Sequence, residues 1–146
     1  MKSVISLYLL FSLFFSVSAN NIKKPISDAN VSSKIKNSLK AGNAKDLVNL
    51  FEKDVELLID SENVEFSKIS NTHAEQILKS FFKKRPPRDF QFMYQGTAAS
   101  IRYSTGTYQS GSESYLVYIL MKVSNGQYLI ETLQFRKEAS NKTAKR

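Results

Sequence analysis

The sequence predicts an α+β domain in which helices pack on one face of a strongly twisted antiparallel sheet. Apolar residues in the first half of the chain recur at helical spacing, and the second half is rich in β-branched and aromatic residues. The dipeptide Asn125-Gly126 is typical of a tight β-hairpin late in the chain. A length of 146 residues suits one such domain and is too short for two full ones.

Residues 1–19 have the layout of a secretory signal peptide, because Lys2 is positively charged, residues 4–15 are apolar apart from two serines, and Ala19 is a small residue at the cleavage position. A retained membrane anchor is the alternative, but the apolar run is shorter than the roughly 20 residues that span a bilayer. We therefore expect cleavage after about Ala19, export to the periplasm or the extracellular space, and no transmembrane segment after cleavage. Residues 20–138 then form the single domain, and residues 139–146 form a flexible basic tail.

Two helices are expected after the signal peptide. Ser27 or Asp28 can cap the first helix, and Gly42 can end it in the left-handed conformation. The apolar residues of this helix fall at i, i+4 and i+8: Val31, Ile35 and Leu39. Asn43 can cap a short second helix that runs to Phe51.

A β-hairpin and a third helix come next. The hairpin has strands at residues 55–59 and 64–66, with a polar turn between them. Thr72 and Glu75 form a capping box that predicts the start of the third helix, and Pro86-Pro87 ends it. The apolar stripe of this helix consists of Ala74, Ile77, Leu78, Phe81 and Phe82.

Four antiparallel strands complete the predicted fold. Aromatic residues alternate with other side chains over residues 89–94, Gly96 breaks this run, and Ile101 begins the next strand. Residues 115–123 form the longest strand and are apolar on both faces, which indicates a central position in the sheet. The Asn125-Gly126 turn brings residues 127–136 back antiparallel to it.

Three stretches carry a resemblance to known proteins: residues 35–51, residues 66–82, and residues 118–133 with the turn Asn125-Gly126-Gln127-Tyr128. The order of elements resembles the cone-shaped nuclear-transport-factor-2-like superfamily, also called cystatin-like, and the three stretches resemble a family of exported bacterial proteins, mostly from Bacteroidetes, known as domain-of-unknown-function family 4783. The resemblance covers roughly residues 30–138 and implies three helices packed on a curved antiparallel sheet. Its motifs are core positions and a turn, so it transfers no catalytic residue.

The composition excludes several chemistries. Without cysteine the chain has no disulfide, no thiolate nucleophile and no cysteine-ligated metal, and a single histidine excludes a His-rich metal site. That residue, His73, falls off the apolar stripe of the third helix and is expected on the surface. There is no Gly-rich phosphate loop and no serine-nucleophile motif. We expect no cofactor and no bound metal.

Glu131 is the residue that could carry chemistry. Strict alternation places it on the same strand face as Leu129, Leu133 and Phe135, which points it into the cone. A desolvated carboxylate there could be a general base of raised pKa. An ion pair with a residue such as Arg102, or a place at the rim of the sheet, are the alternatives.

Five tyrosines have apolar bodies and polar tips that could line a pocket for an apolar or sugar-like ligand: Tyr94, Tyr103, Tyr115, Tyr118 and Tyr128. They could equally complete the core or lie on the outer face of the sheet. The candidate pocket is therefore the set Glu131, Tyr103, Tyr118 and Arg102.

The formal charge of +8 is concentrated in two places. The first is a basic surface cluster after the third helix, made up of Lys83, Lys84, Arg85 and Arg88. The second is residues 136–146, with five basic residues and one acidic residue. Neither contains a stacking aromatic residue, so no nucleic-acid partner is expected. The two basic segments fit better with weak attraction to anionic lipid or to surface polysaccharide. Alternatively, they only keep the protein soluble, one at the end of a helix and the other in a tail.

The sequence thus predicts an exported, non-catalytic binding or interaction module, with room for a small pocket in the cone. Its partner would be an unknown small ligand or an envelope protein, and the resemblance implies a homodimer. The alternative is a small cofactor-free enzyme, like an isomerase or a dehydratase, that uses a pocket carboxylate such as Glu131. A third interpretation is an envelope-associated protein that binds its partner through the basic patches.

Overall fold

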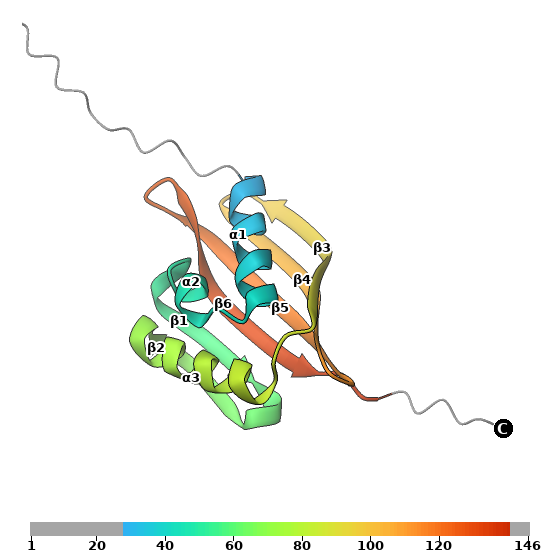
Figure 1. Cartoon of the computed structure of the whole chain (residues 1–146). Coiled ribbons are helices and arrows are strands. Elements are labelled where there is room, and N and C mark those ends of the chain that lie inside the picture. The colour runs from blue at the N-terminus through green and yellow to red at the C-terminus, as the bar shows by residue number, and fades with distance from the viewer. Residues whose placement is uncertain (1–27, 141–146) are drawn as a thin grey trace, which may run out of the picture.

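The computed structural model describes residues 28–140, which fold into three α-helices and a six-stranded sheet (Figure 1). The elements are α1 (Asp28–Ala41), α2 (Ala44–Val48), β1 (Phe51–Ile59), a 3-10 turn (Asp60–Glu62), β2 (Val64–Ser70), α3 (Asn71–Lys84), β3 (Asp89–Ala98), β4 (Ile101–Ser110), β5 (Glu113–Ser124) and β6 (Gln127–Lys137). The expected signal peptide at residues 1–19 and residues 141–146 of the expected tail lie outside the described residues. No helix within residues 28–140 is long and apolar enough to cross a membrane.

The strands form one sheet in the order β2-β1-β6-β5-β4-β3. Neighbours are antiparallel except β1 and β6, which run parallel with Leu57 opposite Leu133. The wholly antiparallel sheet that the sequence predicts therefore contains one parallel pair, because the last strand returns to lie beside the first. This pair joins the β1–β2 hairpin to the meander of β3 to β6. The prediction that β5 is the longest strand and lies inside the sheet is confirmed.

The three helices lie on one face of the sheet, which we call the inner face; the opposite face is the outer face (Figure 1). The predicted apolar stripe of α1 is confirmed, since Val31, Ile35 and Leu39 are almost fully buried. The same holds for the inner side of β1 and for most of the stripe of α3, where Phe81 is buried and Ile77 partly buried. These side chains fill the space between helices and sheet.

The start of α3 differs from the predicted capping box. The hydroxyl of Ser70 accepts the backbone N–H of His73 at 3.4 Å, so Ser70 and not Thr72 caps the helix. The helix begins directly where β2 ends, at Asn71. Two caps could compete within this short polar stretch, and the one that needs no connecting loop is formed.

Two strand boundaries also differ from the prediction. The second helix ends at Val48 because Phe51 begins β1 and is buried opposite Ile130 of β6. β3 does not break at Gly96 but continues to Ala98, so the turn falls at Ala99 and Ser100. Tertiary pairing, which the local sequence does not reveal, decides both boundaries.

The predicted turns at Gly42 and at Asn125-Gly126 are confirmed. Gly42 ends α1 with a φ of 61°, and the Asn43 side chain then caps α2 by accepting the backbone N–H of Asp46 at 3.0 Å. Asn125 and Gly126 both have positive φ, 50° and 75°, as a tight hairpin between β5 and β6 requires.

Candidate functional site

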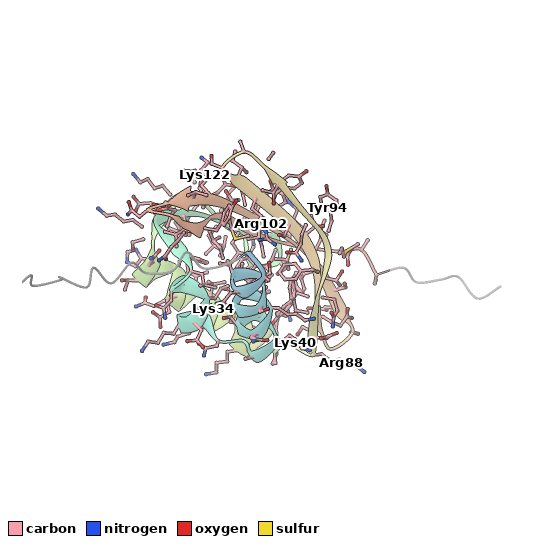
Figure 2. All side chains as sticks on the ribbon, turned by 90° about the horizontal axis from the view of Figure 1, so that it is seen from above. Lys34, Lys40, Arg88, Tyr94, Arg102 and Lys122 are labelled. Atoms are coloured by element: carbon pink, nitrogen blue, oxygen red, sulfur yellow. The ribbon has the colours of Figure 1, made fainter. Side chains whose placement is uncertain are left out.

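The four residues of the predicted pocket lie on two different faces of the sheet. Arg102 is on the inner face beside α1, whereas Tyr94, a neighbour of Tyr103, is on the other side of the sheet (Figure 2). Tyr103 and Tyr118 alternate with buried inner-face residues along β4 and β5, so both are on the outer face. The structure therefore does not bring the four residues together in one pocket.

Glu131 does not point into the cone as alternation predicts. The β5–β6 register passes from Leu120 opposite Thr132 to Met121 opposite Ile130, so Glu131 is the extra residue of a β-bulge. Its carboxylate lies 2.7 Å from the ammonium group of Lys122, and its side chain is 35% exposed. The inward position is thus wrong, because the bulge reverses the alternation, and the ion pair forms with Lys122 instead of Arg102.

Arg102 holds α1 against the edge of the sheet. It is only 8% exposed, and its Nη2 donates to Ser32 Oγ of α1 and to Gln95 Oε1 of β3, both at 3.0 Å. Ser32 Oγ also donates to Gln95 Oε1 at 2.8 Å, which closes a three-membered polar network. The network joins α1, β3 and β4, and its members Ser32 and Gln95 are 63 residues apart in the chain.

The outer face carries a row of aromatic side chains. The rings of Tyr94 and Tyr103 lie 5.7 Å apart, with their hydroxyl oxygens at 3.4 Å. The hydrogen bond to Tyr94, with a smaller effect of Tyr118, raises the pKa of Tyr103 above its ordinary value. Tyr94 is 54% exposed, although it belongs to a β-sheet face rather than a loop.

The interior of the cone near α3 is filled by aromatic rings. The ring centroid of Phe81 lies 4.8–5.8 Å from those of four neighbours: Phe82, Tyr108, Tyr115 and Phe135. Tyr115, one of the predicted pocket tyrosines, is therefore a core residue. The Tyr108 hydroxyl donates to the backbone carbonyl of Arg85, and burial raises the pKa of this phenol. The fully or nearly buried polar residues of the described chain include no carboxylate.

The basic surface cluster is partly neutralised by carboxylates of the same chain. Lys84 lies 2.7 Å from Glu62, and Arg85 lies 3.1 Å from Glu113. Lys83 and Arg88 have no ion-pair partner within residues 28–140. Half of the cluster is thus engaged in fixing the end of α3. His73 is exposed, as predicted, and does not line the interior.

Sequence reasoning missed Ser32 and Gln95, which complete the network around Arg102. Ser32 follows Val31 of the apolar stripe and reads as an ordinary helix residue. Gln95 faces inward only because a second bulge, between Phe92 and Tyr94, shifts the alternation of β3. Polar residues that face each other on the predicted inner side would have indicated this network. Recognising them, however, requires the position of the bulge.

The arrangement of three helices on one face of a six-stranded sheet is the nuclear-transport-factor-2-like, or cystatin-like, fold. An NTF2-like protein of unknown function from Shewanella baltica is 10% identical with a TM-score of 0.61, over 77% of this chain and 91% of that one. A putative ketosteroid isomerase from Kribbella flavida is 10% identical with a TM-score of 0.53, over 75% of this chain and 76% of that one. At such identity these likenesses establish the fold alone.

Residues 32–136 match the domain of unknown function DUF4783, and the chain belongs to this family. A crystal structure of a DUF4783 family protein from Bacteroides uniformis is 20% identical with a TM-score of 0.69, over 75% of this chain and 99% of that one. A DUF4783 family protein from Bacteroides fragilis is 20% identical with a TM-score of 0.66, over 72% of this chain and 96% of that one. The comparison with curated proteins finds no match.

Proposed function

We propose that this protein is a non-catalytic interaction module that associates with a second copy of itself through the outer face of β3 to β6. The observation that carries the proposal is the character of the side chains on this face. A sheet face in contact with water normally carries polar residues. Here the outward positions in the centre are occupied mainly by tyrosine, leucine and threonine: Tyr94, Tyr103, Thr105, Leu116, Tyr118 and Leu120.

The arrangement of charges supports a second copy as the partner. The charged side chains at the border of this patch include both signs: Lys122, Arg136, Glu56, Glu131 and Asp89. A chain with a formal charge of +8 repels its own copies unless the contact surface is neutral. An apolar, aromatic centre with a charged rim is also the usual anatomy of a protein interface.

The size of the face is sufficient for a stable contact. Four strands spaced about 4.8 Å apart, with about 10 residues at about 3.3 Å each, present roughly 600 Å². Two such faces together bury about 1,200 Å², which reaches the lower limit of specific protein interfaces. The outer face can therefore support a dimer without help from other surfaces.

The oligomeric state in solution tests this proposal. We expect the protein to sediment as a dimer and the variant Tyr94→Arg to sediment as a monomer, because the symmetry of the contact brings two new charges into an apolar interface. Phe66→Arg is the matched control, since Phe66 on β2 is 43% exposed and lies outside the outer-face patch. Circular dichroism verifies that both variants are folded.

A monomeric wild-type protein at all accessible concentrations would overturn self-association, and the outer face would then be available to a different partner such as an envelope protein. A dimer that persists in Tyr94→Arg would equally place the contact elsewhere. The enzyme interpretation is not adopted, because Glu131, its named carboxylate, is paired with Lys122 outside the cone. Glu131→Gln is thus expected to leave the fold intact.

Export is the second part of the proposal, and it rests on the sequence of residues 1–19. N-terminal sequencing of the protein from fractionated cells tests it. We expect a mature chain that begins at about Asn20 in the periplasmic or extracellular fraction. An intact N-terminus in the cytoplasmic fraction would contradict export without affecting the dimer.

A further inference from the structure

A groove lies between the helices and the start of β6, on the side of the molecule away from the outer face. It is bordered by α1, by α2 and the residues that follow it, and by residues 127–129, and its volume is about 550 Å³. Small-ligand sites typically have about 300–1,000 Å³. The groove is outside the aromatic interior of the cone, so it is separate from the pocket that the sequence predicted.

Three amide side chains line this groove without a hydrogen-bond partner of their own. Asn37 comes from α1, Asn49 follows α2, and Gln127 begins β6. None makes a side-chain hydrogen bond within the described part of the chain. Each amide has both donors and an acceptor to offer, so the groove presents neutral hydrogen-bonding groups from three different segments.

The remaining lining gives the groove one apolar side and no net charge. Tyr128 and Leu50 are half-buried against the core and provide the apolar surface. Lys34 and Asp46 are the two charged residues in the lining, and their charges cancel. A ligand that fits must therefore be neutral, must carry hydroxyl or similar groups at its edges, and must have an apolar face.

A sugar ring has this combination, because its C–H groups form an apolar face and its hydroxyls point outward from the edge. We propose that this groove binds a neutral saccharide, with the amides of Asn37, Asn49 and Gln127 hydrogen-bonded to hydroxyls and Tyr128 against the apolar side of the ring.

An extended peptide is the competing ligand, and the geometry is against it. Peptides that bind to sheets add a strand to an exposed edge. The groove borders residues 127–129 of β6, which are paired with β5 on one side, whereas β1 pairs with β6 only from Ile130 onward. The free edge is therefore only three residues long, which is shorter than the strand of about five residues that a peptide would add.

The experiment is a titration of ¹⁵N-labelled protein, followed by NMR through backbone and side-chain amide shifts. The probes are the neutral disaccharides maltose, cellobiose and lactose, with tetraalanine as the peptide probe. Asn37→Ala is the test variant, and Gln76→Ala is the matched control, because both remove one exposed amide from the middle of a helix.

We expect at least one disaccharide to shift the signals of Asn37, Asn49 and Gln127. The Asn37→Ala variant should weaken that binding about three- to tenfold, which corresponds to the loss of one hydrogen bond, and Gln76→Ala should bind like the wild type. The absence of shifts with all three disaccharides would overturn the proposal, as would an equal affinity of Asn37→Ala and wild type. Shifts with tetraalanine alone would overturn it in favour of a peptide.

The saccharide proposal is independent of dimer formation, because the two surfaces lie on opposite sides of the sheet. The Tyr94→Arg variant is expected to keep the groove and its saccharide shifts. Failure of the dimer and failure of the groove can therefore be told apart in the same set of variants.

Discussion

Tyr103 of β4 lies flat across Gly96 of β3, its directly opposite partner on the outer face. A Cβ atom at Gly96 would be 2.6 Å from Cζ of Tyr103, which is closer than carbon atoms can approach. The glycine therefore provides the space in which the tyrosine ring rests. In this position the Tyr103 hydroxyl reaches the hydroxyl of Tyr94, and the two rings form the aromatic part of the proposed interface.

Gly96→Ala should displace Tyr103 and destabilise the protein by about 1–3 kcal/mol, the usual cost of overpacking. It should also weaken the dimer, because the Tyr94–Tyr103 pair loses its arrangement. Urea unfolding measures the first effect and sedimentation the second. In a Tyr103→Ala background the same substitution should cost much less, and an equal cost in both backgrounds would show that the ring does not depend on the glycine.

Arg102→Met should destabilise the domain by about 1–3 kcal/mol, because it keeps the aliphatic stem but removes the donor to Ser32 and Gln95. Arg136→Met is the control, since Arg136 is exposed on β6 and should cost under about 0.5 kcal/mol. A cycle with Ser32→Ala should show coupling to Arg102→Met. Additive costs would mean that the network does not act as a unit.

Periodicity predicted the helices and the core, because both depend on which side of an element is apolar. The stripe of α1 and the inner side of β1 are buried as predicted. The pairing of β1 with β6 could not be predicted in this way, since parallel neighbours 76 or more residues apart leave no local pattern. The resemblance to a family supplied the overall cone, and the family match confirms it.

The candidate site was harder to predict because it depends on bulges. One extra residue reverses the direction of every side chain beyond it. The bulge at Glu131 turns the carboxylate outward, and the bulge before Tyr94 turns Gln95 inward. Alternation is therefore reliable along β4, which is regular throughout and carries Arg102 and Tyr103, and unreliable in β3 and β6, which carry Gln95 and Glu131.

Glu113 should make stability depend on acidic pH. The hydrogen bond from Lys137, with Tyr115 and Arg85 nearby, lowers the pKa of this carboxyl below its ordinary value of 4.5. A carboxyl whose pKa is lower in the folded protein stabilises it above the unfolded value, and this contribution is lost as the pH falls through the folded value. Its partner Lys137 has a raised pKa, so its contribution is lost only as the pH rises above 10.5.

Urea unfolding between about pH 6 and about pH 3 measures this effect. The wild type should lose more stability over that range than Glu113→Gln, which lacks the titrating group. Glu65→Gln is the control, because Glu65 is exposed and makes no ion pair within the described residues. Parallel pH profiles for wild type and Glu113→Gln would contradict the role of Glu113.

Tyr108→Phe tests how the end of α3 is attached to the sheet. The hydroxyl of Tyr108 donates to the carbonyl of Arg85, the residue that caps the C-terminus of α3. The substitution keeps the ring in its contact with Phe81 and removes only the donor, which leaves a carbonyl without its partner. We expect a loss of about 1–2 kcal/mol and faster amide exchange at Arg85, whose own N–H bonds to Phe81. Tyr118→Phe is the control and should change neither quantity, because the Tyr118 hydroxyl makes no hydrogen bond to a described residue. Unchanged amide exchange at Arg85 in Tyr108→Phe would show that packing alone holds the end of the helix.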